Sequence, residues 1–157
     1  MSITEIKALL QNAGVVGAGG AGFPAYAKLS EDADLLCINA AECEPYITSD
    51  YREMMERTDD IINGITLVQK QLGIPMCKIC IENNKPDAIK LMEEKTAEIK
   101  SIEVVTLPSE YPQGAEKVIV YSATGRIVAE GELPSNQGVM VMNVSTAAQI
   151  YRYTQDG

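Results

Sequence analysis

The sequence predicts an α/β fold with a mainly parallel sheet and helices on both faces, a Rossmann-like three-layer sandwich. Four short apolar runs alternate with amphipathic stretches, in the order β-α-β-α-β-α-β. The first of these runs is apolar without alternation, which is typical of a strand buried on both faces. At 157 residues, the chain is long enough for one domain with a sizeable core. We therefore expect residues 1–157 to form a single domain.

The amino-terminal part is expected to hold a helix, a glycine-rich loop and the first strand. Ile3 to Asn12 places its apolar side chains on one helical face, and Gly14 ends that pattern. A short helical piece is expected from Pro24 to Lys28. Leu35 to Ala41 is an apolar run bounded by acidic residues, as expected of a buried parallel strand.

A long amphipathic helical stretch follows from Ser49 to Leu72, with an expected break near Arg57 and Thr58. Ser145 is expected to cap the last helix. The other predicted elements are strands at Met76–Asn83, Ile102–Leu107 and Val139–Asn143, and helices at Pro86–Glu98, Gln113–Ala123 and Ser145–Tyr153.

The stretch from Gly14 to Gly22 holds five of the twelve glycines. Glycine loses the most backbone freedom on folding, so such a cluster indicates close approach to a ligand or a nest of N–H groups for an anion, most often phosphate. Gly17, Gly19 and Gly22 also match G-x-G-x-x-G, but a dinucleotide loop should leave a strand, and here a helix precedes it. A flexible turn is the alternative interpretation.

Three charged residues could complete a ligand site with this loop. Lys28 lies six residues past Gly22, within reach of a bound phosphate, although a solvated lysine is the alternative. Glu42 and Glu44 follow the first strand, and ligands of open α/β sheets bind beyond the carboxyl ends of strands. Carboxylates suit sugar hydroxyls, but these two could also be surface acids or charges at a helix start. Together the residues predict a nucleotide or flavin mononucleotide site.

Composition excludes several classes of function. The net charge of −9, from 22 acidic and 13 basic residues, repels nucleic acid backbones. Histidine, the usual acid–base group at neutral pH and a common metal ligand, is absent, so we expect the chemistry to be carried by a bound cofactor. No apolar run approaches membrane-spanning length and no leader pattern opens the chain, which predicts a cytoplasmic protein without membrane insertion.

The four cysteines are Cys37, Cys43, Cys77 and Cys80. The last two form a C-x-x-C inside a predicted strand, where residues three apart face opposite sides of the sheet. The spacing does not match an iron–sulfur ligand run. We therefore expect four reduced thiols and no metal site.

Several segments, in order along the chain, resemble the flavin-binding (51 kDa-type) subunit of respiratory complex I, and more closely the C subunit of the Rnf electron-transport complex. The resemblance covers nearly the whole chain. Its segments are Gly17–Pro24 with Lys28, Asn39–Pro45, Pro45–Thr48, Tyr111–Lys117 and Asn143–Thr146.

The resemblance implies a domain that binds FMN, accepts hydride from NADH and passes electrons to iron–sulfur carriers. It also implies a place at the periphery of a membrane complex, at the inner face of the membrane. No side chain is expected to act as a catalytic proton donor. By position, the implied cofactor-binding residues are Gly17, Gly19, Gly20, Gly22, Lys28, Asn39, Glu42, Glu44, Gly114, Glu116, Asn143 and Thr146.

Within this set, the resemblance implies that Asn39 and Glu42 reach the flavin and that Glu44 lies nearer the nicotinamide nucleotide. It implies that Asn143 and Thr146 close the phosphate and ribityl side.

The sequence departs from the complex I pattern at three positions. Ala18 stands where that pattern has arginine, Ala41 where it has aspartate, and Cys43 where it has glycine. These departures leave open a non-catalytic docking domain that keeps the fold without the flavin; an NAD-binding Rossmann domain is a third interpretation. The resemblance implies that relatives continue into a β-rich domain and cluster-binding segments, so we expect residues 1–157 to be either a truncated form or a stand-alone module.

Overall fold

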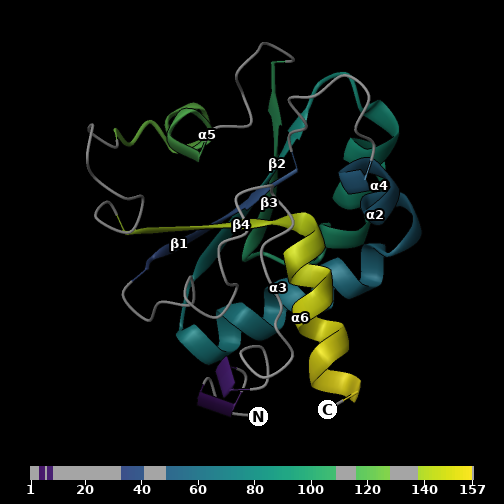
Figure 1. Cartoon of the computed structure of the whole chain (residues 1–157). Helices are drawn as coiled ribbons and strands as arrows, with labels where there is room; N and C mark the ends of the chain where they lie inside the picture. The colour runs from purple at the N-terminus through teal and green to yellow at the C-terminus, as the bar shows by residue number, and fades with distance from the viewer. Residues whose placement is uncertain are drawn as a thin grey trace.

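A computed structural model describes the chain at residues 4–5, 7–8, 33–40, 49–108, 116–127 and 138–156 (Figure 1). Residues 4–5 and 7–8 are helical, in agreement with the predicted first helix. The predicted glycine loop and the short helix after it lie outside the described residues. So does Cys43.

In the described part of the chain, four parallel strands form one sheet in the order β3-β2-β1-β4. The strands alternate with helices along the chain, which confirms the predicted α/β class. Strand bounds agree with the sequence prediction to within two residues. They are β1 Leu35–Asn39, β2 Met76–Glu82, β3 Ile102–Leu107 and β4 Val139–Asn143.

One face of the sheet is covered by four helices: α2 Ser49–Glu56, α3 Thr58–Leu72, α4 Pro86–Thr96 and α6 Val144–Asp156. Their apolar side chains pack with Leu36, Ile38 and other strand residues into the larger of two hydrophobic cores. Every second strand residue contributes to this core because successive strand side chains point to opposite faces. This core therefore holds most of the buried apolar surface.

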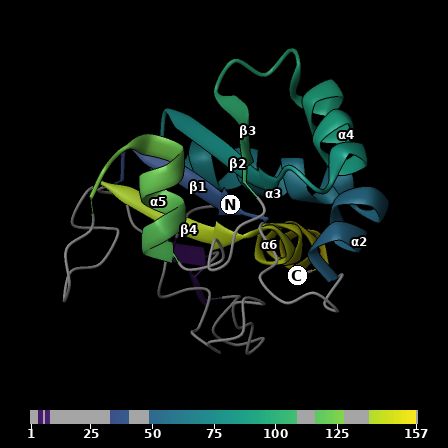
Figure 2. The same cartoon turned by 90° about the horizontal axis from the view of Figure 1, so that it is seen from above.

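The opposite face carries a smaller core under α5 Glu116–Thr124, which lies apart from the other helices in Figures 1 and 2. Ile119 and Val120 of α5 pack here against Leu35, Cys37 and other strand residues. Lys78 extends from this face of β2, and its Nζ donates to the Ala123 carbonyl at 3.0 Å. A cation at the negative end of a helix dipole stabilises that end, so Lys78 fixes α5 against the sheet. Helices on both faces confirm the three-layer arrangement.

The break predicted in the long helical stretch falls at Arg57, between α2 and α3. Its backbone, at φ −129° and ψ 37°, leaves the helical region, and Thr58 Oγ1 donates back to the Met54 carbonyl. At the other end, Gly73 stops α3 with a left-handed φ of 67°, and its N–H donates to the Gln69 carbonyl.

The cap of α6 differs from the prediction. Asn143, the last residue of β4, accepts a hydrogen bond at its Oδ1 from the Ser145 N–H at 2.7 Å. Asn143 rather than Ser145 therefore caps the helix, because the strand runs directly into α6 and places the asparagine side chain over the first free N–H groups. The helix also continues to Asp156, past the predicted end at Tyr153.

Helices α3 and α6 pack very closely. A Cβ added at Gly64 in α3 would overlap the Ala147 carbonyl oxygen of α6 and lie 2.7 Å from the carbonyl carbon. Arg152 of α6 adds ion pairs to Glu53 of α2 and Asp60 of α3, each at 3.8 Å. These contacts hold α6, and with it the β4–α6 junction, in a fixed position on the sheet.

At the amino end of the sheet, Arg126 forms a bidentate ion pair with Asp34, with N–O distances of 2.8 Å and 3.1 Å. The guanidinium lowers the pKa of the Asp34 carboxyl, mainly through this hydrogen bond. Gly138, at φ 75°, accepts the N–H groups of Asp34 and Leu35 at its carbonyl. This contact ties the starts of β1 and β4 together, far from their carboxyl ends.

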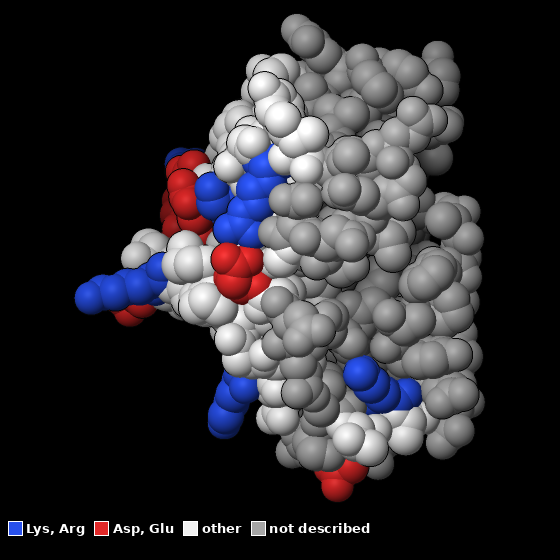
Figure 3. All heavy atoms as spheres, turned by 90° about the vertical axis from the view of Figure 1, so that its left-hand side faces the viewer, with Lys and Arg blue, Asp and Glu red and all other residues white. Residues whose placement is uncertain are grey.

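The described helices include none that is both long enough and apolar enough to span a bilayer. Figure 3 shows one face of the molecule, where the described basic side chains lie interspersed with acidic ones. No continuous basic strip forms among the described residues of that face, in agreement with the acidic composition.

Candidate functional site

The sheet order places a topological switch point between β1 and β4. From β1 the chain proceeds outward through β2 and β3, and then returns to add β4 on the other side of β1. In open parallel sheets, a crevice lies outside the carboxyl ends of the strands at the point where the strand order reverses. Ligands of α/β proteins bind in this crevice. The edge at the ends of β1 and β4 is therefore the candidate site.

Two asparagines meet at this edge. Asn39 ends β1, Asn143 ends β4, and the two are register partners in the parallel ladder. Asn39 lies two residues after Cys37, and Asn143 lies two residues after Val141. Cys37 and Val141 both belong to the core under α5. Because strand side chains alternate, both amides belong to the α5 side of the sheet. The structure therefore brings together two of the residues predicted from sequence, although they are 104 positions apart.

The first turn of α6 completes the described part of this edge. Asn143 caps the helix through Ser145, and Thr146 is 3% exposed in the same turn. A helix start presents unpaired N–H groups and the positive end of the helix dipole, which together favour an anion. Thr146, also predicted from sequence, thus lies at the helix start beside Asn143.

Sequence reasoning missed Glu82. This residue ends β2, the other neighbour of β1, and is 6% exposed. It follows Cys80 and Lys78 by two and four residues, so it belongs to the same side of the sheet as the two asparagines. Glu82 closes a strand whose other residues are apolar except Lys78, much as Asn39 closes β1.

Three buried cysteines lie beneath the edge, namely Cys37, Cys77 and Cys80. Cys77 belongs to the larger core and Cys80 to the smaller one, which confirms that the C-x-x-C pair is split between opposite faces. Cys80 Sγ lies 3.5 Å from Cys37 Sγ, and this contact, together with burial, raises the pKa of the Cys80 thiol. Desolvation likewise raises the pKa of Cys77.

These three cysteines are free thiols, as predicted. The described residues contain no cluster of cysteine and acidic side chains able to hold a metal ion.

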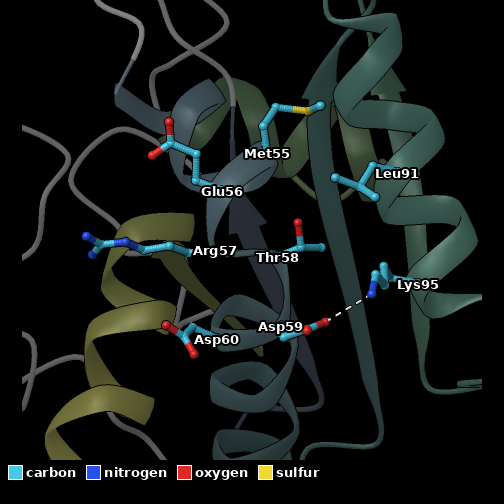
Figure 4. Close-up of a pocket in the computed structure, with 8 residues that line it drawn as sticks. All are labelled: Met55, Glu56, Arg57, Thr58, Asp59, Asp60, Leu91 and Lys95. Carbon is cyan, nitrogen blue, oxygen red and sulfur yellow. Dashed lines mark ion pairs between the residues drawn. The ribbon is translucent and has the colours of Figure 1, made fainter.

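A hollow of about 400 Å³ lies elsewhere, where the α2–α3 break meets α4 (Figure 4). It lies between Met55, Arg57 and Leu91, and Lys95 pairs across it with Asp59 at 3.3 Å. The helices that line it pack on the face of the sheet opposite to Asn39 and Asn143. This charged surface hollow is therefore separate from the candidate site.

The side chains of the remaining predicted site residues lie outside the described part of the chain. Glu116 begins α5, but its side chain is outside the described part. The others outside the described residues are Gly17, Gly19, Gly20, Gly22, Lys28, Glu42, Glu44 and Gly114.

Comparison with known families identifies the chain. The family described as the Nuo51 FMN-binding domain matches residues 10–152, most of the chain. The chain belongs to this family. The resemblance inferred from the glycine loop and the Asn39 and Asn143 segments is thereby confirmed.

The relatives of this FMN-binding domain are longer proteins. The C subunit of the proton-translocating ferredoxin:NAD(+) oxidoreductase complex of Clostridium ljungdahlii is 42% identical over 154 residues, which are 96% of this chain and 34% of that protein. The corresponding C subunit of the Na(+)-translocating complex of Acetobacterium woodii is also 42% identical, over 96% of this chain and 35% of its own length. The chain thus spans about a third of the length of these relatives.

Solved structures show the same fold. Two crystal structures of an NAD+-reducing [NiFe]-hydrogenase match 99% of this chain and 31% of theirs. The air-oxidized state gives a TM-score of 0.82 at 22% identity, and the H2-reduced state 0.76 at 21%. At these identities the likeness concerns the fold alone.

The described residues fit the cofactor that gives this family its name. The amides of Asn39 and Asn143 can each donate and accept hydrogen bonds, which suits the polar edge of an isoalloxazine ring and the hydroxyls of a ribityl chain. The start of α6 suits a phosphate. The described donors at the switch point are thus compatible with the ring, ribityl and phosphate groups of a mononucleotide.

Proposed function

We propose that this chain binds FMN across the carboxyl ends of β1 and β4 as an electron-transfer domain that accepts hydride from NADH and passes electrons to iron–sulfur carriers. The observation that carries the proposal is the register pair Asn39–Asn143 at the topological switch point of a chain that belongs to an FMN-binding family. The glycine loop and Lys28 are proposed to hold the phosphate, with Thr146 and the start of α6 beside it.

The proposed protein contribution is binding and orientation. Bound FMN supplies the redox chemistry: it accepts a hydride and releases electrons one at a time. Glu42, Glu44, Gly114 and Glu116 are proposed to border the ring and the nicotinamide nucleotide, which would hold the two rings in contact and exclude water. The absence of histidine agrees with this division of labour, because no side chain needs to transfer a proton.

Two further observations support NADH as the donor and a larger assembly as the setting. The relatives from C. ljungdahlii and A. woodii are named as subunits of ferredoxin:NAD(+) oxidoreductase complexes, and the solved neighbours as NAD+-reducing hydrogenases. We propose that residues 1–157 form a single domain that works with iron–sulfur subunits, in the cytoplasm or peripheral to a membrane complex at its inner face.

The test is titration of the purified chain with FMN, followed by flavin fluorescence and absorption, and then anaerobic addition of NADH. We expect FMN to bind with quenching of its fluorescence, and NADH to bleach the flavin absorption. The Asn39→Ala variant should weaken FMN binding, whereas Asn63→Ala, an exposed position in the middle of α3, should leave it unchanged.

Each negative result contradicts a different part of the proposal. A wild-type chain that folds but takes up no FMN would refute the cofactor assignment and favour a docking domain. FMN binding without reduction by NADH would keep the flavin site and reject NADH as the donor.

A further inference from the structure

Glu82 is a buried acidic residue in an unusual place. Glutamates are rarely this buried unless a partner compensates the loss of hydration, because a charge in an apolar environment is costly. Only 6% of Glu82 is exposed, at the last position of a strand whose preceding residue, Ile81, is fully buried. Glu82 is therefore a buried acidic side chain at the carboxyl edge of the sheet, on the strand next to β1.

Strand geometry puts Glu82 within reach of the same ligand as the asparagines. The ladder pairs Asn39 of β1 with Cys80 of β2, so Glu82 lies two residues farther toward the carboxyl edge. With neighbouring strands about 4.8 Å apart and a rise of about 3.3 Å per residue, the Cα atoms of Asn39 and Glu82 are roughly 8 Å apart. Both residues belong to the α5 side of the sheet.

Asn143, Asn39 and Glu82 thus close three consecutive strands, β4, β1 and β2. Two strand spacings cover about 10 Å, which is close to the length of an isoalloxazine ring. The start of α6, at the β4 end of this row, suits the phosphate. A mononucleotide with its phosphate there would extend its ring along the row toward β2.

We propose that Glu82 lies beside the isoalloxazine ring of bound FMN and lowers the reduction potential of the flavin. Reduction adds electron density to the ring, and a carboxylate nearby disfavours that change by Coulomb repulsion. This inference rests on the proposed FMN site. It adds a residue of β2 to a site that the sequence motifs assigned only to other segments of the chain.

The experiment measures the flavin potential by anaerobic equilibration of the FMN-loaded chain with a reference dye, for the wild type, Glu82→Gln and Glu103→Gln. Glu103 is the matched control: it is an exposed glutamate of β3, paired in register with Lys78 and distant from the carboxyl edge. Both variants remove one negative charge, so they differ only in the place from which it is removed.

Glu82→Gln should favour the reduced flavin by about tenfold, which corresponds to a shift of about 30 mV to more positive potential for a two-electron couple. Glu103→Gln should change the ratio of reduced to oxidised flavin less than twofold. A residue that only supported the fold would alter stability or FMN affinity and leave the potential unchanged. An unchanged potential in Glu82→Gln, or equal shifts in both variants, overturns the inference.

If Glu82→Gln does not fold, as judged by urea denaturation, Glu82→Asp replaces it. This variant keeps the negative charge but moves it one methylene farther from the ring, so the potential should rise by less than in Glu82→Gln. No rise in the potential overturns the inference. A wild-type chain that takes up no FMN instead refutes the proposed function itself. The two failures are therefore distinguishable.

Discussion

The tight contact between α3 and α6 predicts that Gly64→Ala destabilises the protein, although alanine is the better helix former. The added Cβ would lie 2.7 Å from the Ala147 carbonyl carbon, whereas ordinary carbon contacts need about 3.5 Å, so the helices must separate by about 1 Å. A gap of that size forfeits a quarter to a half of each dispersion contact at the interface. Ile61 and Ile65 of α3 and Ile150 of α6, all buried in the larger core, lose packing.

Overpacking of this kind costs about 1–3 kcal/mol, and the gain in helix propensity offsets about 1 kcal/mol of it. The net loss of up to about 2 kcal/mol corresponds to a fall in Tm of up to about 8 °C for a chain of this length. Because Asn143 caps α6, displacement of that helix should also weaken FMN binding.

Urea and thermal denaturation, each followed by circular dichroism, measure the effect. Asn63→Ala is the control, since Asn63 is the neighbouring residue in α3 but is exposed. It should change the free energy of unfolding by no more than about 0.5 kcal/mol. Equal or higher stability of Gly64→Ala would contradict the reasoning and show that α6 accommodates a methyl group at this contact.

Three further predictions concern the amino end of the sheet and the candidate site. Arg126→Ala removes a partly exposed ion pair worth about 0–1 kcal/mol. Because Arg126 lowers the pKa of Asp34, the stability difference from wild type should be full at pH 7 and disappear as the pH falls below about 3.9, through the folded-state pKa; a pH-independent difference in urea denaturation contradicts this. Asn143→Ala removes the side chain that accepts the Ser145 N–H and should lower stability by about 1 kcal/mol and weaken FMN binding. Ser145→Ala keeps this cap and should therefore cost less; the reverse order would restore Ser145 as the cap. Lys28→Ala should weaken FMN more than riboflavin in fluorescence titrations, because its charge acts on phosphate, and equal weakening of both would exclude that role.

Much of the fold followed from local pattern. Short apolar runs predicted the four strands, because burial of a strand is reflected in the apolar character of successive residues. The α2–α3 break at Arg57 was also predicted. The cap of α6 was wrongly assigned to Ser145, because the sequence alone does not show that β4 leads directly into α6 without an intervening loop.

The candidate site was only partly visible in the sequence. Asn39, Asn143 and Thr146 were identified by resemblance, and the structure brings them to one edge. Glu82 was missed because it belongs to no sequence motif and lies next to turn residues, where an acidic side chain does not by itself indicate a site. Its place emerges only when the strand order makes β2 the neighbour of β1.

By itself, the sequence determined the class of fold, the approximate bounds of the described strands and the acidic, histidine-free composition that points to a cofactor. These are properties of a residue and its near neighbours, and they need no knowledge of distant contacts. Strand order was decided only by the tertiary structure, because pairing depends on which buried faces fit together over long separations. That order created the switch point between β1 and β4, aligned Asn39 with Asn143, and added Glu82 to the same row.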